Sequence, residues 1–200
     1  MGKKLFAVVL GFAVAFGAVG EAAAEGDVLT GDTRLACEAV LCLSSGTRPG
    51  ECSPSLSRYF GIKKKKLSDT LKARLDFLEM CPASNQTAEM TSLVRAISRG
   101  AGRCDAASLN RTLIYWTGGD DGRMYIGNQL PEYCTQYTGH QYTDLGDGQA
   151  RYVGVPERGG HWVEAGDYDR ALAAYNERIR QEDAEGRRGE RGIGSSWWAR

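Results

Sequence analysis

The sequence predicts a mainly α-helical domain that is stapled by disulfides and ends in a small C-terminal β-hairpin and a final helix. Three observations predict it. A basic and then apolar segment opens the chain, six cysteines follow, and apolar residues recur at three- and four-residue spacings through the first half. Because an oxidising compartment converts clustered thiols to disulfides, these features together favour exported helices that are tied covalently.

The first 24 residues have the composition of a secretory signal peptide. Two lysines precede an apolar run over residues 5–20, and small residues ending at Ala24 form a cleavage site. A retained membrane anchor is the alternative, but the run is shorter than the roughly 20 residues of a spanning helix. We expect export to the periplasm, cleavage after Ala24, and no integral membrane segment afterwards.

Six cysteines lie beyond the signal, and we expect them to form three disulfides. They are Cys37, Cys42, Cys52, Cys81, Cys104 and Cys134. An even number in an exported chain favours a disulfide framework, whereas the paired C-x-x-C or Cys/His spacings of a zinc site are missing. The sequence does not choose among the possible pairings. Favouring neighbours along the chain gives Cys42–Cys52, Cys37–Cys81 and Cys104–Cys134.

Helical spacing divides the first half into a compact set of helices. The expected helices cover residues 33–44, 53–61, 68–80, 87–99 (or from 92) and 105–114. The residues able to cap them are Asp32 or Thr33, Ser53, Ser68, Thr87 or Ser92, and Asp105. Glycine or proline follows most of these segments, which favours helix ends at those points.

The second half is rich in glycine and tyrosine. Residues 118–122 and 146–148 are expected to be loops. Arg151–Val155 and His161–Glu164 flank a glycine-rich turn, which predicts a β-hairpin. The alternating and helical spacing of the aromatics places Tyr152, Trp162 and Tyr175 in the core.

A last helix is expected to begin at Asp167 or Asp169, with four apolar residues along one face. They are Ala171, Leu172, Tyr175 and Ile179. From residue 181 charge and glycine dominate, which predicts a mobile tail over 181–200. Its Trp197-Trp198 pair is either a docking element or loosely packed. We expect one domain over 25–180, with a possible hinge at 101–105.

Charge balance argues against direct nucleic-acid binding. The chain holds 25 basic and 25 acidic residues, so it presents no global basic field. The run Lys63–Lys66 is expected to be a solvated loop, with contact to lipid head groups or nucleic acid as the alternative.

Motifs that carry catalysis or bind metals are missing from the sequence. His140 and His161 are isolated, so we expect each to be packed or hydrogen-bonded. Asp120, Asp121, Asp144 and Asp147 lie in glycine-containing stretches that do not fit a calcium loop, and they are expected to serve turns. Glu38 and Glu79 lie on predicted helices, but nothing distinguishes either as a general acid. We expect no catalytic, cofactor-binding or metal site.

Several stretches together resemble one family. They are Leu29–Ser44, Cys52–Phe60, Ala73–Pro82, Arg151–Glu164, Asp167–Leu172 and Tyr175–Ile179. Their ordered combination is similar to the TrbM/KikA/MpfK family of conjugal transfer proteins, with the weakest similarity between residues 83 and 127. The resemblance covers Cys37, Cys42, Cys52 and Cys81.

The resemblance implies an exported accessory protein of plasmid conjugation that assists a type IV secretion channel or pilus during mating-pair formation. Its implied partner is a periplasmic component of that apparatus, and it implies no catalysis or cofactor. Two alternatives stay open at this stage: a peptidoglycan-acting enzyme that opens the wall for the channel, and a toxin- or immunity-type effector.

Overall fold

The computed structural model describes residues 28–118 and 122–194, with side chains up to residue 187. The predicted signal peptide, the pair Asp120 and Asp121, and Trp197-Trp198 lie outside the described residues.

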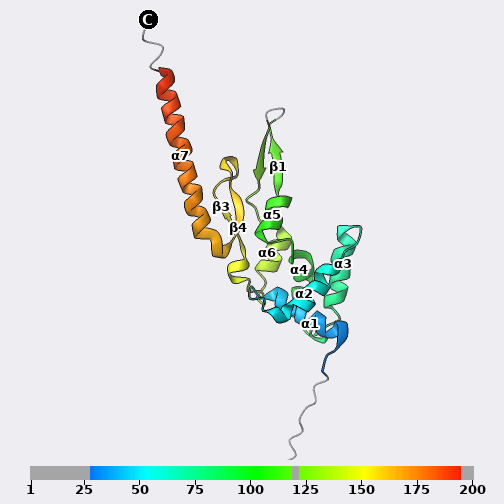
Figure 1. Cartoon of the computed structure of the whole chain (residues 1–200). Helices are drawn as coiled ribbons and strands as arrows, with labels where there is room; N and C mark the ends of the chain where they lie inside the picture. Colours follow the sequence, from blue (N-terminus) through cyan, green and yellow to red (C-terminus); the bar gives the residue numbers. More distant parts are fainter. Residues whose placement is uncertain (1–27, 119–121, 195–200) are drawn as a thin grey trace, which may run out of the picture.

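The structure is mainly helical, as the sequence predicts, with two small antiparallel hairpins (Figure 1). The helices are α1 Gly31–Ser44, α2 Ser53–Gly61, α3 Leu67–Leu78, α4 Ala88–Gly100, α5 Ala106–Thr112, α6 Glu132–Thr138 and α7 Tyr168–Gly194. The strands are β1 Ile114–Thr117, β2 Arg123–Ile126, β3 Ala150–Val153 and β4 His161–Glu164.

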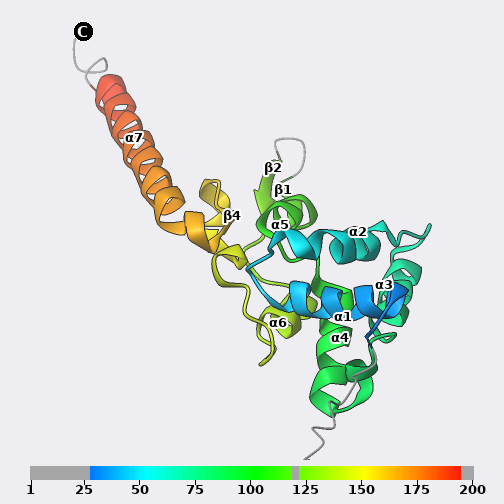
Figure 2. The same cartoon turned by 60° about the horizontal axis from the view of Figure 1, so that its bottom comes forward.

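The core lies where helices α1, α2, α3 and α6 meet α4. Helices α1 and α2 run side by side, and α4 crosses next to α1 and α3 (Figure 2). The apolar stripes predicted for the helices point into this core, where Leu43, Leu78 and Ile97 are fully buried. Burying such side chains contributes about 1.5–3 kcal/mol each, so these residues drive the packing of the helices.

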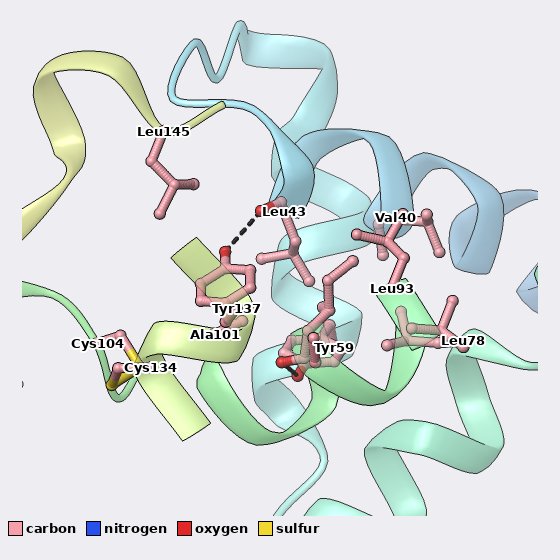
Figure 3. Packing of buried hydrophobic residues seen from close by; sticks show 14 of the residues in the cluster. Val40, Leu43, Tyr59, Leu78, Leu93, Ala101, Cys104, Cys134, Tyr137 and Leu145 are labelled. Atoms are coloured by element: carbon pink, nitrogen blue, oxygen red, sulfur yellow. Dashed lines mark hydrogen bonds between the residues drawn. A yellow bond between two sulfur atoms is a disulfide. The ribbon is translucent and has the colours of Figure 1, made fainter. Parts of the chain in front are cut away.

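Two buried tyrosines hydrogen-bond to backbone carbonyl oxygens inside the core. Tyr59 donates a hydrogen bond to the carbonyl oxygen of Ile97 at 3.2 Å, and Tyr137 donates one to that of Leu43 at 2.6 Å (Figure 3). Tyr137 packs closely against the end of α4, because a Cβ added at Gly100 would lie 2.5 Å from its Cβ. Satisfied in this way, the hydroxyl groups avoid the cost of burying an unpaired polar group.

Three disulfides join the helices. Cys37 of α1 is bonded to Cys81 after α3, Cys42 of α1 to Cys52 before α2, and Cys104 after α4 to Cys134 of α6. These are the three pairs that joining neighbours along the chain gives. Each closes a loop of the unfolded chain, and each therefore favours the folded state by limiting the entropy of the alternative.

The helix starts differ from the prediction at three positions. Ser53, expected as a cap, is the first residue of α2, and Cys52 precedes it without a side-chain cap. Thr30 precedes α1 without a side-chain cap, and Asp32, expected as a cap, instead pairs with Arg58 of α2. Ser68 lies inside α3 and not before it, because Thr70 accepts a hydrogen bond from the Lys64 amide and closes the preceding turn. A tertiary ion pair and a local turn thus replace the expected caps.

Two other caps are confirmed. The Thr87 hydroxyl accepts from the Met90 amide at 3.1 Å, and the Asp105 carboxylate accepts from the Ser108 amide at 2.8 Å. The fifth helix nevertheless ends at Thr112, earlier than predicted, because Ile114 begins β1. The hairpin of β1 and β2 and the short helix α6 were not predicted from the sequence.

The predicted hairpin is confirmed as β3 and β4, with Tyr152 opposite Trp162. Strand β3 ends at Val153, two residues before the expected end. Gly154 follows with a positive φ of 79°, and a Cβ there would lie 2.2 Å from the Tyr175 ring of α7. The close approach of α7 therefore requires glycine at this position.

Helix α7 is longer than predicted. The charge and glycine content predict a tail from residue 181, whereas the helix continues to Gly194 and projects away from the rest of the molecule (Figure 1). Arg158 holds Glu182 and Asp183 at 3.2 and 2.6 Å, and Arg178 also pairs with Glu182. These ion pairs stabilise α7 as far as residue 183, since Arg178 and Glu182 form an i,i+4 pair and Arg158 anchors the same turn to the β3–β4 hairpin. The mobility of residues 181–200 and the hinge at 101–105 stay predictions.

Candidate functional site

A groove of about 760 Å³ runs between α4 and α6. The α4 side contributes Ala88, Ser92, Arg95, Ala96 and Arg99, and the other side is formed by the end of α6 and the turn that follows it. Figure 2 shows these two helices next to one another. Small residues on both sides leave the groove open, and no residue that lines it carries a carboxylate.

His140 lies in this groove with both ring nitrogens engaged. Its Nδ1 accepts from the Tyr142 amide at 3.2 Å, and its Nε2 lies 2.8 Å from the Ser92 hydroxyl oxygen. Because Nδ1 is an acceptor, Nε2 carries the proton and donates to Ser92. The Ser92 hydroxyl in turn donates to the carbonyl oxygen of Glu89 at 2.8 Å.

This direction of hydrogen bonding does not activate Ser92. A serine nucleophile needs a histidine nitrogen that accepts its proton, whereas here the histidine nitrogen donates. The pair therefore orders the turn after α6 against α4. This agrees with the expectation that His140 is a hydrogen-bonded residue.

Arg95 and Arg99 form a basic edge along the groove. They are one turn apart on α4, and both are exposed. Neither guanidinium makes a hydrogen bond, ion pair or ring contact with a described residue. By contrast, Arg58, Arg103 and Arg158 are each held by a carboxylate or an aromatic ring.

The hairpin of β1 and β2 carries a second candidate surface. Facing residues of an antiparallel pair share a side, so Ile114, Trp116, Met124 and Ile126 form one wholly apolar face. Trp116 is 70% exposed and Met124 58% exposed. The hairpin extends from the body of the molecule (Figure 1), and the outer part of this face, Trp116 and Met124, is exposed, whereas Ile126 packs against the core. Contiguous exposed apolar residues of this kind are typical of interaction sites.

The other residues that the sequence analysis considered do not come together. Lys63–Lys66 form an exposed loop between α2 and α3, and His161 lies in β4 with its Nδ1 3.4 Å from the Gly159 carbonyl oxygen. Glu38 is paired with Arg34 on the surface of α1. In the part of the chain that the structure describes, no three His, Cys, Asp or Glu side chains gather around a possible metal position.

The perturbed ionisable groups of the interior serve the core. Burial raises the pKa of Tyr137 to about 12 and also raises the pKa of Tyr59. Both hydroxyls stay protonated and donate to backbone carbonyls, so neither is available as a base. Trp162 and Tyr152, predicted to be core residues, lie edge to face, with Trp162 buried and Tyr152 half-buried.

Among residues 28–118 and 122–194, no helix combines the length and the apolar character required to cross a membrane. The fold and its surfaces define the class: a mainly helical, disulfide-bonded protein with a polar groove and a projecting apolar hairpin.

A sequence model of the TrbM family matches residues 28–176, and the chain belongs to that family. Membership implies a role related to conjugal transfer. No curated protein and no solved structure matches the chain.

Proposed function

We propose that the protein is a periplasmic accessory protein of conjugation, which binds another periplasmic component of the transfer channel or pilus and catalyses no reaction. The observation that carries the proposal is the TrbM family match over residues 28–176. Two further observations support it. The three disulfides suit an oxidising compartment, and the opening segment has the composition of an export signal.

The apolar face of the β1–β2 hairpin is the surface that we assign to this partner. Tryptophan and tyrosine are enriched at interface hot spots, and methionine adapts to irregular surfaces. Trp116 and Met124 face one another across the two strands, so their exposed side chains form one continuous apolar surface that a partner can contact. A hairpin that projects beyond the helices can reach into a groove of a larger assembly.

The test compares donors that lack the gene and carry either the wild-type gene or a variant. Trp116→Ala with Met124→Ala is expected to lower transfer frequency at least about ten-fold, because truncating a hot spot costs about 2 kcal/mol or more of binding energy. Leu41→Ala is the matched control, since Leu41 is 72% exposed on α1, outside the hairpin. Periplasmic levels of each variant are measured in parallel.

A photoreactive residue at position 116 identifies the partner. It is expected to capture a channel or pilus component in the donor periplasm, whereas the same residue at position 41 is not. Wild-type transfer by the hairpin variant would exclude the hairpin as the contact. Full transfer without the gene would contradict the proposed role itself. A lytic band in a cell-wall zymogram would favour the enzyme alternative.

A further inference from the structure

We propose that the groove between α4 and α6 binds an extended acidic polypeptide segment, whose carboxylates pair with Arg95 and Arg99. This inference concerns a different surface from the hairpin, and it does not depend on the place of the protein in conjugation. It rests on the charge of the groove, the spacing of the two arginines and the groups around them.

The two arginines are set apart from most others of the described chain by having no partner. Arginine side chains elsewhere are held by carboxylates, as in the pair of Arg58 with Asp32, or by rings, as in Arg151 over Tyr168 at 3.7 Å. The groove that Arg95 and Arg99 line offers no carboxylate, and the one aromatic ring among its lining residues, the His140 imidazole, is hydrogen-bonded to Ser92 and to the Tyr142 amide. Two adjacent positive charges without a counter-charge favour an anionic ligand.

The spacing of Arg95 and Arg99 matches an extended chain. Residues at i and i+4 on a helix lie on one face, about 6 Å apart. Alternate residues of an extended strand point to one side and lie about 6.6 Å apart. Two carboxylates separated by one residue on an extended segment can therefore each meet one guanidinium, in the bidentate geometry that arginine favours.

The rest of the groove is suited to a peptide backbone. Ala88, Ala96 and Gly139 leave space for a main chain to approach. Gln136 and Gln141 supply amides that can pair with peptide groups. The amide nitrogen of Gln136 already donates to Glu132 at 3.0 Å, which leaves its carbonyl oxygen free to accept.

A polypeptide is favoured over a nucleic acid by the same lining. Binding of single strands relies on aromatic side chains that stack with bases, whereas no Phe, Tyr or Trp lines the groove and the His140 ring is held by hydrogen bonds to Ser92 and to the Tyr142 amide. Duplex binding relies on many phosphate contacts, whereas the groove offers two arginines. The basic run Lys63–Lys66 belongs to the loop between α2 and α3 and does not line the groove.

The experiment titrates purified, disulfide-bonded, ¹⁵N-labelled protein with the peptide acetyl-Gly-Ser-Glu-Ser-Glu-Ser-Gly-amide. Backbone amide signals of Ser92, Ala96 and Gly139 are expected to shift in a saturable and salt-sensitive way. Arg95→Gln with Arg99→Gln is expected to weaken the affinity at least about ten-fold, which corresponds to the loss of about 1.4 kcal/mol. Both side chains are exposed, so the variant is expected to fold normally.

Two controls make the result specific. Arg123→Gln removes an exposed arginine of β2 that also has no partner among the described residues, and it is expected to leave peptide binding unchanged. The peptide with glutamine in place of both glutamates is expected not to bind. Equal binding of that peptide, shifts confined to Lys63–Lys66, or unchanged affinity of the double variant would overturn the proposal. Tighter binding of a DNA oligonucleotide or of inorganic phosphate to the same amides would also overturn it.

Discussion

The two hairpins of this protein have strands of equal length, yet the tryptophan of one is buried and the tryptophan of the other is exposed. In the β3–β4 hairpin Trp162 is 5% exposed, whereas in the β1–β2 hairpin Trp116 is 70% exposed. Both tryptophans face a large apolar or aromatic residue across the strands, Tyr152 for one and Met124 for the other. Local pairing is therefore similar, and the difference lies in what covers each hairpin.

The β3–β4 hairpin is held from several sides. Asn110 of α5 accepts from the Trp162 amide at 2.8 Å and donates to its carbonyl oxygen at 2.7 Å. The Trp162 indole donates to the Gly127 carbonyl oxygen at 2.8 Å, and α7 covers the end of β3 through Tyr175. Every polar group of this tryptophan is satisfied inside the fold.

The hydrogen bonds that join the β1–β2 hairpin to the body lie near its base. The Gly127 amide donates to the Leu113 carbonyl oxygen at 2.8 Å, and Tyr152 donates to that of Ile126 at 2.7 Å. The turn Pro156–Arg158 also approaches β2, yet Trp116 stays 70% exposed and Met124 58% exposed. The comparison shows that one hairpin completes the core, while the other is available for a partner.

Replacing each tryptophan by alanine is the sharpest test of this comparison. Trp162→Ala is expected to lower the free energy of unfolding by about 3–5 kcal/mol, because it leaves a cavity and removes the indole N–H that donates to the Gly127 carbonyl oxygen. Trp116→Ala is expected to change it by less than about 0.5 kcal/mol, as for other exposed positions. Chemical denaturation followed by circular dichroism measures both.

The two variants serve as each other's control, since the residue type and the substitution are the same. A large loss of stability in Trp116→Ala would show that the outer hairpin packs against the body. A small loss in Trp162→Ala would show that the inner hairpin contributes little to the core.

The Cys104–Cys134 disulfide restrains the segment that carries the exposed hairpin. Its sequence separation of 30 residues encloses β1 and β2. Replacing both cysteines by serine is expected to cost about 3.6 kcal/mol from loop entropy alone. It is also expected to speed hydrogen exchange of the hairpin amides, because the base of the segment is no longer fixed. Denaturation and exchange mass spectrometry measure the two effects.

The Cys42–Cys52 disulfide is the matched comparison. Its separation is 10 residues, and its removal is expected to cost less, about 2.7 kcal/mol, without altering exchange in the hairpin. If the two removals affect the hairpin equally, the restraint is not specific to Cys104–Cys134.

Local signals in the sequence predict much of this fold. Helix α2 has the predicted bounds because Ser53-Pro54 opens it and Gly61 closes it. Strands β3 and β4 follow from apolar alternation around a glycine-rich turn, and Thr87 and Asp105 cap the helices that they precede. Each of these features is decided within a few residues.

Features decided by distant contacts were missed. Leu109, Leu113 and Ile114 have helical spacing, yet Ile114 pairs with Ile126 in a strand. The groove could not be predicted from the sequence either, because Ser92 and His140 are 48 residues apart and no local pattern indicates their contact. For Arg95 and Arg99 the i,i+4 spacing was visible, but their lack of partners could be recognised only after folding.

Glu164, at the end of β4, gives a small effect that depends on pH. Its Oε1 accepts from the Ala106 amide at 3.0 Å, while its Oε2 is buried without a partner among the described residues. Burial raises the pKa of this carboxyl, and nearby Asp105 and Asp167 raise it further, whereas the Ala106 amide and Arg48 act in the opposite direction. At pH values between the ordinary glutamate pKa and the raised pKa of Glu164, the folded state therefore binds more protons than the unfolded state.

The sign follows from this difference in bound protons. The free energy of unfolding is expected to fall as the pH rises from the ordinary glutamate pKa through the raised one, and then to contribute no further change. The effect is below about 1 kcal/mol, because the side chain is only partly shielded from solvent. In Glu164→Gln this slope is expected to disappear, so that the variant is at least as stable as the wild type at neutral pH.

Urea denaturation at a series of pH values measures the slope. Glu157→Gln, in the exposed turn of the same hairpin, is the control, and it should retain the wild-type slope because Glu164 is intact. If Glu164→Gln kept the wild-type slope, the proton would be bound elsewhere. If the variant were clearly less stable at neutral pH, the charged carboxylate would stabilise the inner hairpin, and its buried oxygen would have a partner in solution.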